Sequence, residues 1–462
     1  RLAELMPFLS LSRPVLTSGV IQTKNHILIR MEEIMKTNRT FKTGISILSV
    51  SSVLLVLSFG LFQFTIMPPL VAFEEEQKIL TDVLTLEMTI GGEDDPHKDE
   101  FLLVSPKLMD VSYEGDILIP DEGKIKVYDD KGNEKTIIGR IGQGPAEFKL
   151  LHSPFLSPTG YLIVADVSGR KWSSFHYSGD SKLVHSYNLF SPDYSFIEKR
   201  RFDNSLRIDD YLKTKNVSRG NVKYIRRIYA LSEYEKVYEI EIVLGSLLLS
   251  RLPFFNAPSS IVILYENAET VIPLVETRFI ASPNDYNSYF ELGQLHWELM
   301  PDRRIMYLNT DEDIYNIQTG SFYTVHTLSL DGLEDKKITR QFSTIEFPES
   351  KTNREEYSKN ESFRQREERE VKAYREKKYY ASVDWVKIDG NYAFMFTYTQ
   401  NDKEEILTDV FDLKAGKYIT SVYFPFVPIV IRDGYAYYLQ WSGGYTFAEV
   451  RKYKIDPAVY GK

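Results

Sequence analysis

Similar segments recur along this chain at intervals of about 45 residues. Asp121 and Asp166 each end a short run that alternates like a strand, and they lie 45 positions apart. Near the C-terminus, Gly390 and Gly434 each begin an aromatic run, and 44 positions separate them. An interval of this length between strand-like segments is typical of one four-stranded propeller blade. The sequence therefore predicts a β-propeller.

The recurring segments share the chemistry of a hairpin. At 410–416 an apolar pair precedes Asp412 and then Gly416, and a matching segment at 314–320 lies 96 positions earlier. The Asp caps the turn and the Gly can adopt positive φ. A β-sandwich also contains such hairpins, but equal spacing favours a propeller. We expect an all-β propeller domain over 79–462 with five to seven blades.

A glycine-rich segment lies between the first two repeats, over 139–148. Gly139, Gly142, Gly144 and Pro145 are expected to set the turn between two blades, and Phe148 to act as an apolar plug beneath it. The glycines also resemble a dinucleotide-binding loop, but the strand and helix that such a loop needs are absent from the pattern. We therefore interpret these five residues as structural.

The N-terminal part of the chain differs from the rest. Residues 1–34 precede a Met-Lys start and are interpreted as a leader, non-native or disordered, without a structural role. Within 35–78 an apolar run at 45–62 has basic residues before it and acidic residues after it. This charge order predicts a signal peptide or a membrane anchor with the following domain outside the cytoplasm. The protein is then expected in the periplasm or cell envelope, and in the inner membrane if the segment is uncleaved.

A charged segment interrupts the strand pattern at 349–378. It is rich in Glu, Arg and Lys, contains no Gly or Pro, and often places opposite charges three or four residues apart. These features predict a solvated helical insertion across one face of the ring. It is either a lid or docking element, or an exposed connection between repeats.

Composition excludes several classes of function. The net charge is −9, with 56 basic and 65 acidic residues mixed along the domain, which argues against a nucleic-acid partner. The sequence has no cysteine. A disulfide framework, a thiolate zinc site, a cysteine nucleophile and a lipid-modified cysteine are therefore all impossible.

The glycine-rich segment at 139–148, the hairpin before it and the closing segments at 409–418 and 450–455 together resemble a known group. They are similar to the exported six-bladed β-propeller proteins of Bacteroidetes-type bacteria, which are related to NHL-repeat and TolB-like propellers. The resemblance implies fold and export, since many members of that group have no assigned activity. This chain departs from the pattern at Ala146, where Gly is frequent, and lacks the lipobox cysteine that some members carry.

Two functional hypotheses follow. The first is a non-catalytic module that binds a peptide, glycan or protein partner across the ring face and needs no cofactor. Aromatic loop residues would supply the contact surface: Tyr194, Phe196, Tyr286, Tyr289, Trp441 and Tyr445. The alternative is a lyase, lactonase or hydrolase in which Asp, Asn, Glu or His hold Ca²⁺ or Zn²⁺ on the axis. No catalytic or metal-binding residue can be selected from the sequence. We also expect the strand at 83–90 to join the strands after 427 and close the ring.

Overall fold

The computed structural model describes residues 79–462 except for a set of short segments. The omitted residues are 94–98, 150, 169–183, 202–205, 244–257, 281–292, 317, 319, 355 and 441–447. The predicted leader at 1–34 and the apolar segment within 35–78 thus lie outside the described residues. Within the described ranges, no helix is both long and apolar enough to span a membrane.

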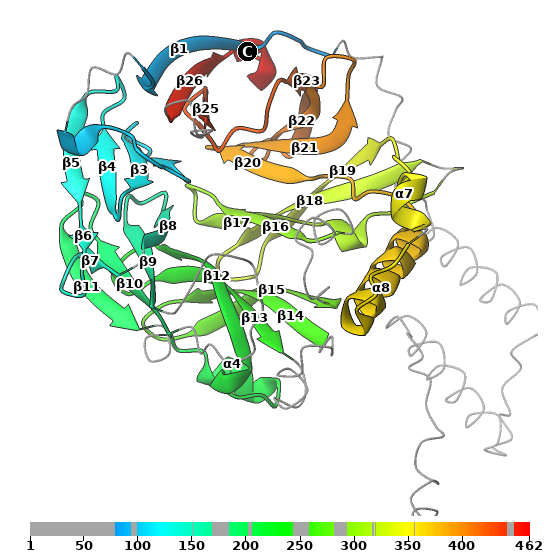
Figure 1. Cartoon of the computed structure of the whole chain (residues 1–462), viewed down its shortest axis with the longest axis horizontal. Helices are drawn as coiled ribbons and strands as arrows, with labels where there is room; N and C mark the ends of the chain where they lie inside the picture. The colour runs from blue at the N-terminus through cyan, green and yellow to red at the C-terminus, as the bar shows by residue number, and fades with distance from the viewer. Residues whose placement is uncertain are drawn as a thin grey trace, which may run out of the picture. The chain divides into compact units, whose positions relative to one another are not determined.

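Six four-stranded antiparallel sheets form the blades of a propeller (Figure 1). Blade 1 contains β2 (Asp110–Val111), β3 (Ile117–Asp121), β4 (Lys124–Tyr128) and β5 (Glu134–Ile138). Blade 2 contains β8 (Leu151–Leu156), β9 (Leu162–Ser168), β10 (Val184–Phe190) and β11 (Phe196–Arg201). Blade 3 contains β12 (Val222–Ala230), β13 (Lys236–Val243), β14 (Pro258–Glu266) and β15 (Val271–Ile280). The predicted all-β propeller with six blades is confirmed.

The second half of the ring repeats this arrangement. Blade 4 contains β16 (Leu295–Leu299), β17 (Arg304–Asn309), β18 (Ser321–Ser329) and β19 (Asp335–Phe342). Blade 5 contains β20 (Trp385–Asp389), β21 (Tyr392–Gln400), β22 (Ile406–Asp412) and β23 (Lys417–Phe424). Blade 6 contains β24 (Val430–Arg432), β25 (Tyr435–Gln440), β26 (Glu449–Ile455) and β1 (Leu84–Gly91). Short elements join the blades: β6 (Arg140–Ile141), β7 (Glu147–Phe148), α4 (Asp209–Thr214), α7 (Glu349–Thr352), α8 (Glu361–Lys377) and the 3-10 turns η1 (Asp99–Phe101) and η2 (Arg219–Asn221). A third 3-10 turn, η3 (Thr310–Glu312), lies between β17 and β18 within blade 4, and η4 (Pro457–Tyr460) follows β26.

The two ends of the domain close the ring together. Strand β1 is the outermost strand of blade 6 and pairs antiparallel with β26, with Leu84 opposite Ile455 and Ile90 opposite Val450. Val83 and Ile90 are 5% and 1% exposed. This matches the closure expected from the sequence and leaves no blade incomplete.

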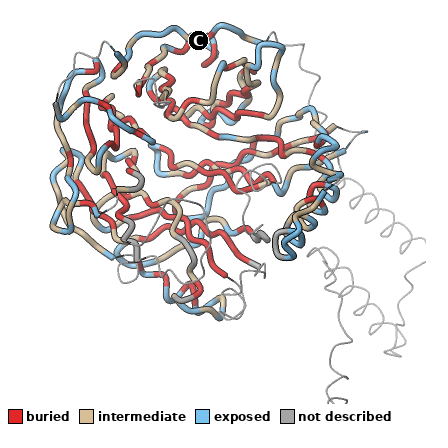
Figure 2. Tube along the Cα trace, in the orientation of Figure 1, coloured by how far each residue is buried: buried red, intermediate tan, exposed pale blue. Residues whose placement is uncertain are grey.

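Burial falls from the middle of each blade to its outer edge (Figure 2). All eight residues of β13 are buried, and so are all five of β3. The outermost strands β5 and β19 carry mostly exposed or half-buried residues. An edge strand can face water and carry charge, whereas charged residues of an enclosed strand need partners. In β13 the Trp297 indole donates to Glu239 at 2.7 Å, and Arg226 pairs with Glu241 at 2.7 Å.

Six apolar clusters fill the six junctions between neighbouring blades. Trp297, which is 1% exposed, belongs to the cluster between blades 3 and 4, and Phe148 to the one between blades 1 and 2. The core is therefore distributed around the ring, because each blade buries its faces only against its neighbours.

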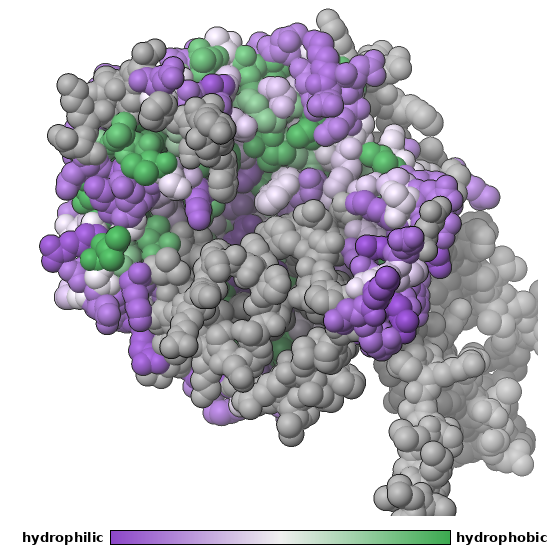
Figure 3. Space-filling view, in the orientation of Figure 1, coloured by the Kyte–Doolittle hydropathy of each residue, from purple (hydrophilic) through white to green (hydrophobic). Residues whose placement is uncertain are grey.

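The charged insertion is helical, as expected, but it forms two helices. Helices α7 and α8 follow β19 and precede β20, and α8 lies at the rim of the ring in Figure 1. Hydrophilic residues cover this part of the surface in Figure 3. Within the insertion Val371 and Tyr374 are buried, and Phe347 packs edge-on against Tyr374 with ring centroids 4.7 Å apart. Lys377 reaches Asp311 at 2.7 Å, which ties α8 to blade 4.

The repeat intervals map onto equivalent positions, with one exception. Gly390 and Gly434 both form the turn between the first and second strands of their blades. The match between 314–320 and 410–416 was wrong, because the first joins the second and third strands of blade 4 and the second joins the third and fourth strands of blade 5. The Asn316 side-chain oxygen accepts the Gln318 amide at 2.9 Å, and the Asp412 carboxylate accepts the Ala415 amide at 2.8 Å. The same turn chemistry thus recurs in two different hairpins.

Candidate functional site

The first strand of each blade is innermost and borders the ring axis: β2, β8, β12, β16, β20 and β24 (Figure 1). Charged and polar residues occur on five of these strands or in the turns that follow them. We call this set the axial cluster; it comprises Asp110, Tyr113, Arg227, Tyr229, His296, Glu298, Lys387 and Arg432. No residue of this cluster was selected from the sequence.

Strand alternation places these residues. On β12, Ile228 and Ala230 enter the apolar cluster between blades 2 and 3, so Arg227 and Tyr229 project from the opposite face. The Nη1 atom of Arg227 donates to the Trp297 carbonyl at 2.7 Å. The Arg227 side chain keeps 36% of its surface exposed. Such exposure fits a side chain that faces the axis.

Cationic side chains of the axial cluster also bridge other junctions between innermost strands. Lys387 Nζ on blade 5 donates to the Ile429 carbonyl, just before β24 of blade 6, at 2.8 Å. Arg432 Nε on blade 6 donates to the Val111 carbonyl of blade 1 at 3.2 Å. Arg227 links blade 3 to blade 4 in the same way. Three of the six junctions are thus held by a cation on a backbone carbonyl.

Neutral and acidic groups bridge the remaining junctions. The Leu156 amide of blade 2 donates to Asp110 Oδ2 of blade 1 at 3.3 Å. Thr159 of blade 2 donates to the Leu231 carbonyl of blade 3 at 3.0 Å. His296 of blade 4 bonds the backbone of Val383, just before blade 5. Side-chain-to-backbone bonds therefore form a belt that crosses all six junctions.

The acidity of Asp110 is strongly perturbed. Burial raises the pKa of Asp110 to about 6, and the nearby Arg432 charge opposes that rise. Glu298 raises the same pKa further. Glu298 belongs to blade 4, which lies across the ring from blade 1. The Glu298 charge therefore acts on Asp110 across the axis, and the lower dielectric there strengthens the effect.

The basic members respond to the same environment. Burial lowers the pKa of Lys387, the Arg227 charge lowers it further, and Glu298 and Asp110 oppose both effects. Burial and the Arg227 charge together lower the pKa of His296 to about 3, so this imidazole is neutral at pH 7. Cations, carboxylates and a neutral His thus share one electrostatic environment.

Two buried donors or acceptors of the cluster lack a hydrogen-bond partner among the described residues. They are Arg432 Nη1 and His296 Nε2. Arg432 is 9% exposed, and its guanidinium lies 3.9 Å from the centre of the Tyr113 ring. Buried polar atoms in native structures nearly always have partners. The cluster therefore offers unmet hydrogen-bonding capacity at the axis.

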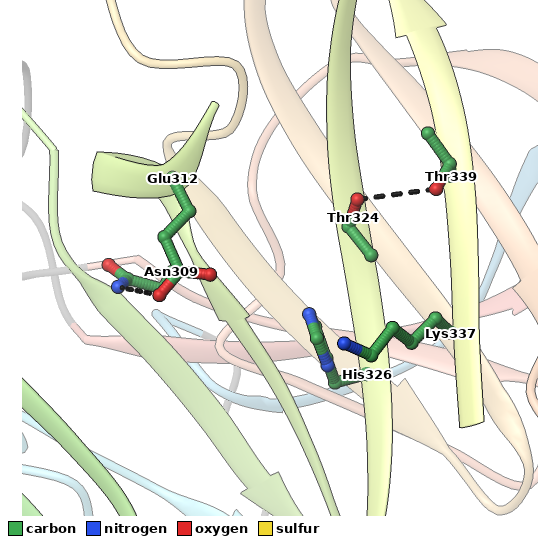
Figure 4. Close-up of a pocket in the computed structure, with 6 residues that line it drawn as sticks. All are labelled: Asn309, Glu312, Thr324, His326, Lys337 and Thr339. Carbon is green, nitrogen blue, oxygen red and sulfur yellow. Dashed lines mark hydrogen bonds between the residues drawn. The ribbon is translucent and has the colours of Figure 1, made fainter. Parts of the chain in front are cut away.

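A second polar region lies on blade 4 (Figure 4). This cavity of about 200 Å³ is lined by Asn309, Glu312, Thr324, His326, Lys337 and Thr339. The His326 ring stacks on Tyr307 at 4.4 Å between centroids, and its Nδ1 lies 3.1 Å from both Asp335 carboxylate oxygens. The Thr324 hydroxyl is paired with the Thr339 hydroxyl at 3.3 Å. A His and a carboxylate are thus adjacent, but neither threonine contacts the imidazole.

Of the six aromatic residues predicted to bind a partner, two are described. The Tyr194 hydroxyl donates to Asp116 Oδ2 at 2.7 Å and so ties blade 2 to blade 1. Phe196 begins β11 and packs edge-on against Phe190, with centroids 5.8 Å apart. Their role in binding stays a prediction. The other four lie outside the described residues: Tyr286, Tyr289, Trp441 and Tyr445.

The glycine-rich segment lies between β5 of blade 1 and β8 of blade 2. Gly139 has φ +73°, and a Cβ at this position would lie 2.1 Å from the ring of Phe148, which is fully buried. A Cβ on Gly142 would lie 2.1 Å from the Glu147 carboxylate, which accepts the Gly144 amide at 2.8 Å. The close approach of Phe148 and Glu147 is what requires glycine here.

The metal-dependent alternative receives no support from the described residues. Among them, no group of three or more His, Asp or Glu side chains is placed to hold a metal ion. The axial cluster instead mixes two carboxylates with three cations, and cations repel a metal ion. The cofactor prediction stays untested.

One sequence signal could have revealed the axial cluster. In Trp297-Glu298-Leu299 and Val386-Lys387-Ile388, a single charge stands between apolar residues within the first strand of a repeat. Aligning first strands across blades would have separated these charges from the solvated ones. The pattern is short, and the first strands of blades 1 and 6 contain only two and three residues.

No family model matches the chain, and no curated protein matches it. Among solved structures, it is similar to a protein described as exported from Bacteroides fragilis, with 13% identity, a TM-score of 0.41 and coverage of 82% of this chain and 98% of that one. A DUF4221 family member from Bacteroides vulgatus is 10% identical, with a TM-score of 0.39 and coverage of 80% of this chain and 98% of that one. A protein described as TolB from Agrobacterium tumefaciens is 9% identical, with a TM-score of 0.33 and coverage of 76% of this chain and 91% of that one. At these TM-scores the fold assignment rests on the chain's own six sheets.

Proposed function

We propose that this protein is an exported, non-catalytic β-propeller that acts as a binding or scaffold module for a peptide, glycan or protein partner. The observation that carries the proposal is Trp385, a large aromatic residue that is 37% exposed on an innermost strand. Tryptophan offers a broad apolar surface with one polar edge, which suits stacking on a sugar ring or a peptide side chain.

The surroundings of Trp385 support a binding role. Lys387 lies two residues further on β20, so the two side chains share a face of the strand, and Lys387 Nζ is 5.9 Å from the Trp385 ring centre. An aromatic surface beside a cation is a common arrangement for ligand recognition. Both residues lie on a paired strand of the propeller, and a preorganised backbone reduces the entropy lost on binding.

The non-catalytic part of the proposal rests on how the axial groups are engaged. Arg227, Lys387 and Arg432 each donate to a backbone carbonyl of a neighbouring blade. Asp110 accepts two backbone amides, at 2.8 and 3.3 Å. Side chains that hydrogen-bond to the backbone in this way hold neighbouring blades together, and these bonds hinder proton transfer to a substrate. The export part rests on the apolar segment at 45–62 with its basic and acidic flanks.

Binding to defined peptide and glycan panels tests this proposal. The purified full chain is immobilised and probed by biolayer interferometry. The Trp385→Ala variant should weaken binding at least about tenfold, because losing a stacked aromatic residue costs about 1–2 kcal/mol or more. Leu333→Ala is the matched control, since Leu333 is 83% exposed in the outer turn of blade 4.

Three outcomes are informative. Panel binding that Trp385→Ala weakens and Leu333→Ala leaves unchanged supports the proposal. Equal binding by all three proteins would remove the assigned surface. Mass spectrometry of the recovered ligand tests catalysis, and chemical conversion of the ligand would contradict a purely binding role.

A further inference from the structure

The charges of the axial cluster do not balance. Three side chains are cationic, namely Arg227, Lys387 and Arg432, and two are carboxylates, Asp110 and Glu298. Only Arg227 forms a direct ion pair among the described residues, with Glu298 at 3.1 Å. Lys387 and Arg432 have no carboxylate within 4.0 Å in the described part of the chain. Two cations at the axis are thus without an ionic partner.

These two cations also retain donors. Arg432 directs Nε to the Val111 carbonyl, but Nη1 has no partner among the described residues although Arg432 is only 9% exposed. Lys387 carries three donors, and one of them reaches the Ile429 carbonyl. A buried cation is normally paired as well as hydrogen-bonded, because desolvating it costs several kcal/mol. Each of these two cations therefore keeps unused capacity to bind a negative group.

A purely structural role does not require the charges. The belt needs a donor to a backbone carbonyl at each junction, and Thr159 performs this with a neutral hydroxyl between blades 2 and 3. A neutral donor would avoid the desolvation cost. Two unpaired cations on adjacent blades 5 and 6 are better explained by a ligand that supplies the missing charge.

We infer that the axial cluster binds an oxyanion group of the ligand, a carboxylate or a phosphate, through Lys387 and Arg432. This inference deepens the proposed function and rests on it, since the oxyanion would be the charged part of the bound partner and Trp385 would contact an adjacent part. Arg227 is held by Glu298 and adds positive potential without direct contact. Oxyanions suit both cations, because guanidinium and ammonium donors form charge-assisted bonds with them.

Anion titration of the full chain tests the inference. Inorganic phosphate and, separately, acetate are titrated at pH 7.5 and constant ionic strength, and the thermal midpoint is followed together with tryptophan fluorescence. We expect a saturable response to at least one anion. The phosphate and acetate arms distinguish a phosphate-bearing ligand from a carboxylate-bearing one.

Lys387→Gln is the principal variant, and Lys452→Gln is its matched control. Lys452 is buried, and like Lys387 its Nζ donates to a backbone carbonyl at 2.8 Å, that of Asp130. It lies on β26, however, away from the innermost strand of its blade. Losing a hydrogen bond to a charged group should raise the anion Kd about tenfold to hundredfold in Lys387→Gln. The Kd of Lys452→Gln should match that of the unsubstituted chain.

Arg432 provides a second variant. Arg432→Lys keeps the charge but loses the planar fork, so it should weaken phosphate at least about tenfold while the circular dichroism spectrum is retained. If this variant does not fold, the comparison of Lys387→Gln with Lys452→Gln decides alone.

The outcomes separate this inference from the proposed function. Lack of saturable binding of either anion, or equal weakening in Lys387→Gln and Lys452→Gln, would overturn the inference. Panel ligands that bind Lys387→Gln as tightly as the unsubstituted chain would likewise overturn it, while the proposed binding function would stand. Anion binding that is lost in Lys387→Gln supports the site even where Trp385→Ala leaves panel binding unchanged.

Discussion

Replacement of Ile90 by Ala should destabilise the whole ring. Ile90 lies on the closing strand β1, is 1% exposed, and belongs to the apolar cluster between blades 6 and 1 together with Leu103, Val111 and Val450. Removing its three outer carbons leaves a cavity that neighbours on two blades cannot fill together. Buried Ile-to-Ala changes of this type cost about 2–5 kcal/mol. We expect a value near the upper half of that range, because the site joins two independently anchored sheets.

Urea unfolding monitored by circular dichroism measures this loss. Leu86→Ala is the matched control, since Leu86 lies on the same strand but is 52% exposed. Substitution at an exposed site should cost no more than about 0.5 kcal/mol. If Ile90→Ala and Leu86→Ala differ by less than about 0.5 kcal/mol, β1 does not close the ring as described. A separate early transition confined to the Ile90 variant would show that blade 6 unfolds alone.

Three further perturbations test other parts of the molecule. Gly139→Ala should lower the free energy of unfolding in urea by about 2–4 kcal/mol, because positive φ costs about 1–2 kcal/mol and the new Cβ meets Phe148. Gly416 also has positive φ, +69°, but no atom lies within 4 Å of its added Cβ. Gly416→Ala should therefore lose only about 1–2 kcal/mol, the cost of positive φ. Affinity for sulfate, which stays fully charged, should rise about fivefold from pH 7.5 to pH 5. Over this range Asp110, with a pKa of about 6, is protonated, and the net charge of the axial cluster goes from +1 to +2. Asp110→Asn should remove this pH dependence. The pKa of His296 is about 3 in the folded state and about 6.5 in the unfolded state, so the unfolded chain binds more protons between these pH values. His296 should therefore reduce the free energy of unfolding by about 2 kcal/mol from pH 7 to pH 5. A His296→Gln variant whose free energy of unfolding depends on pH as steeply as that of the unsubstituted chain would contradict this.

The sequence predicted those parts of the fold that are encoded locally. A turn needs particular residues at particular positions, so Gly390 and Gly434 marked equivalent turns of blades 5 and 6 at the correct interval. The same local character misled the match between 314–320 and 410–416, because an Asp or Asn before Gly forms a turn in any hairpin. Local patterns establish that a hairpin exists, but not which hairpin of the blade it is.

The axial cluster could not be predicted because its members are distant in sequence. Glu298 acts on Asp110 only when the ring brings blades 1 and 4 to face a common axis. In the sequence, Lys387 and Arg432 are ordinary charges in a chain where 26% of residues are charged. Aromatic residues in loops attracted attention instead, whereas Trp385, which carries the proposed binding surface, is in a strand.

The pairing of β1 with β26 sets a condition on the order of folding. Leu84 and Ile455 are partners, yet roughly 370 residues separate them. At typical synthesis rates of about 5–20 residues per second, β1 exists for about 20–70 s before its partner has been made. During that time β1 is an unpaired strand, and such strands readily add to other exposed sheet edges. A chain that is exported before folding would avoid this interval, because both strands would then become available in the same compartment within one passage.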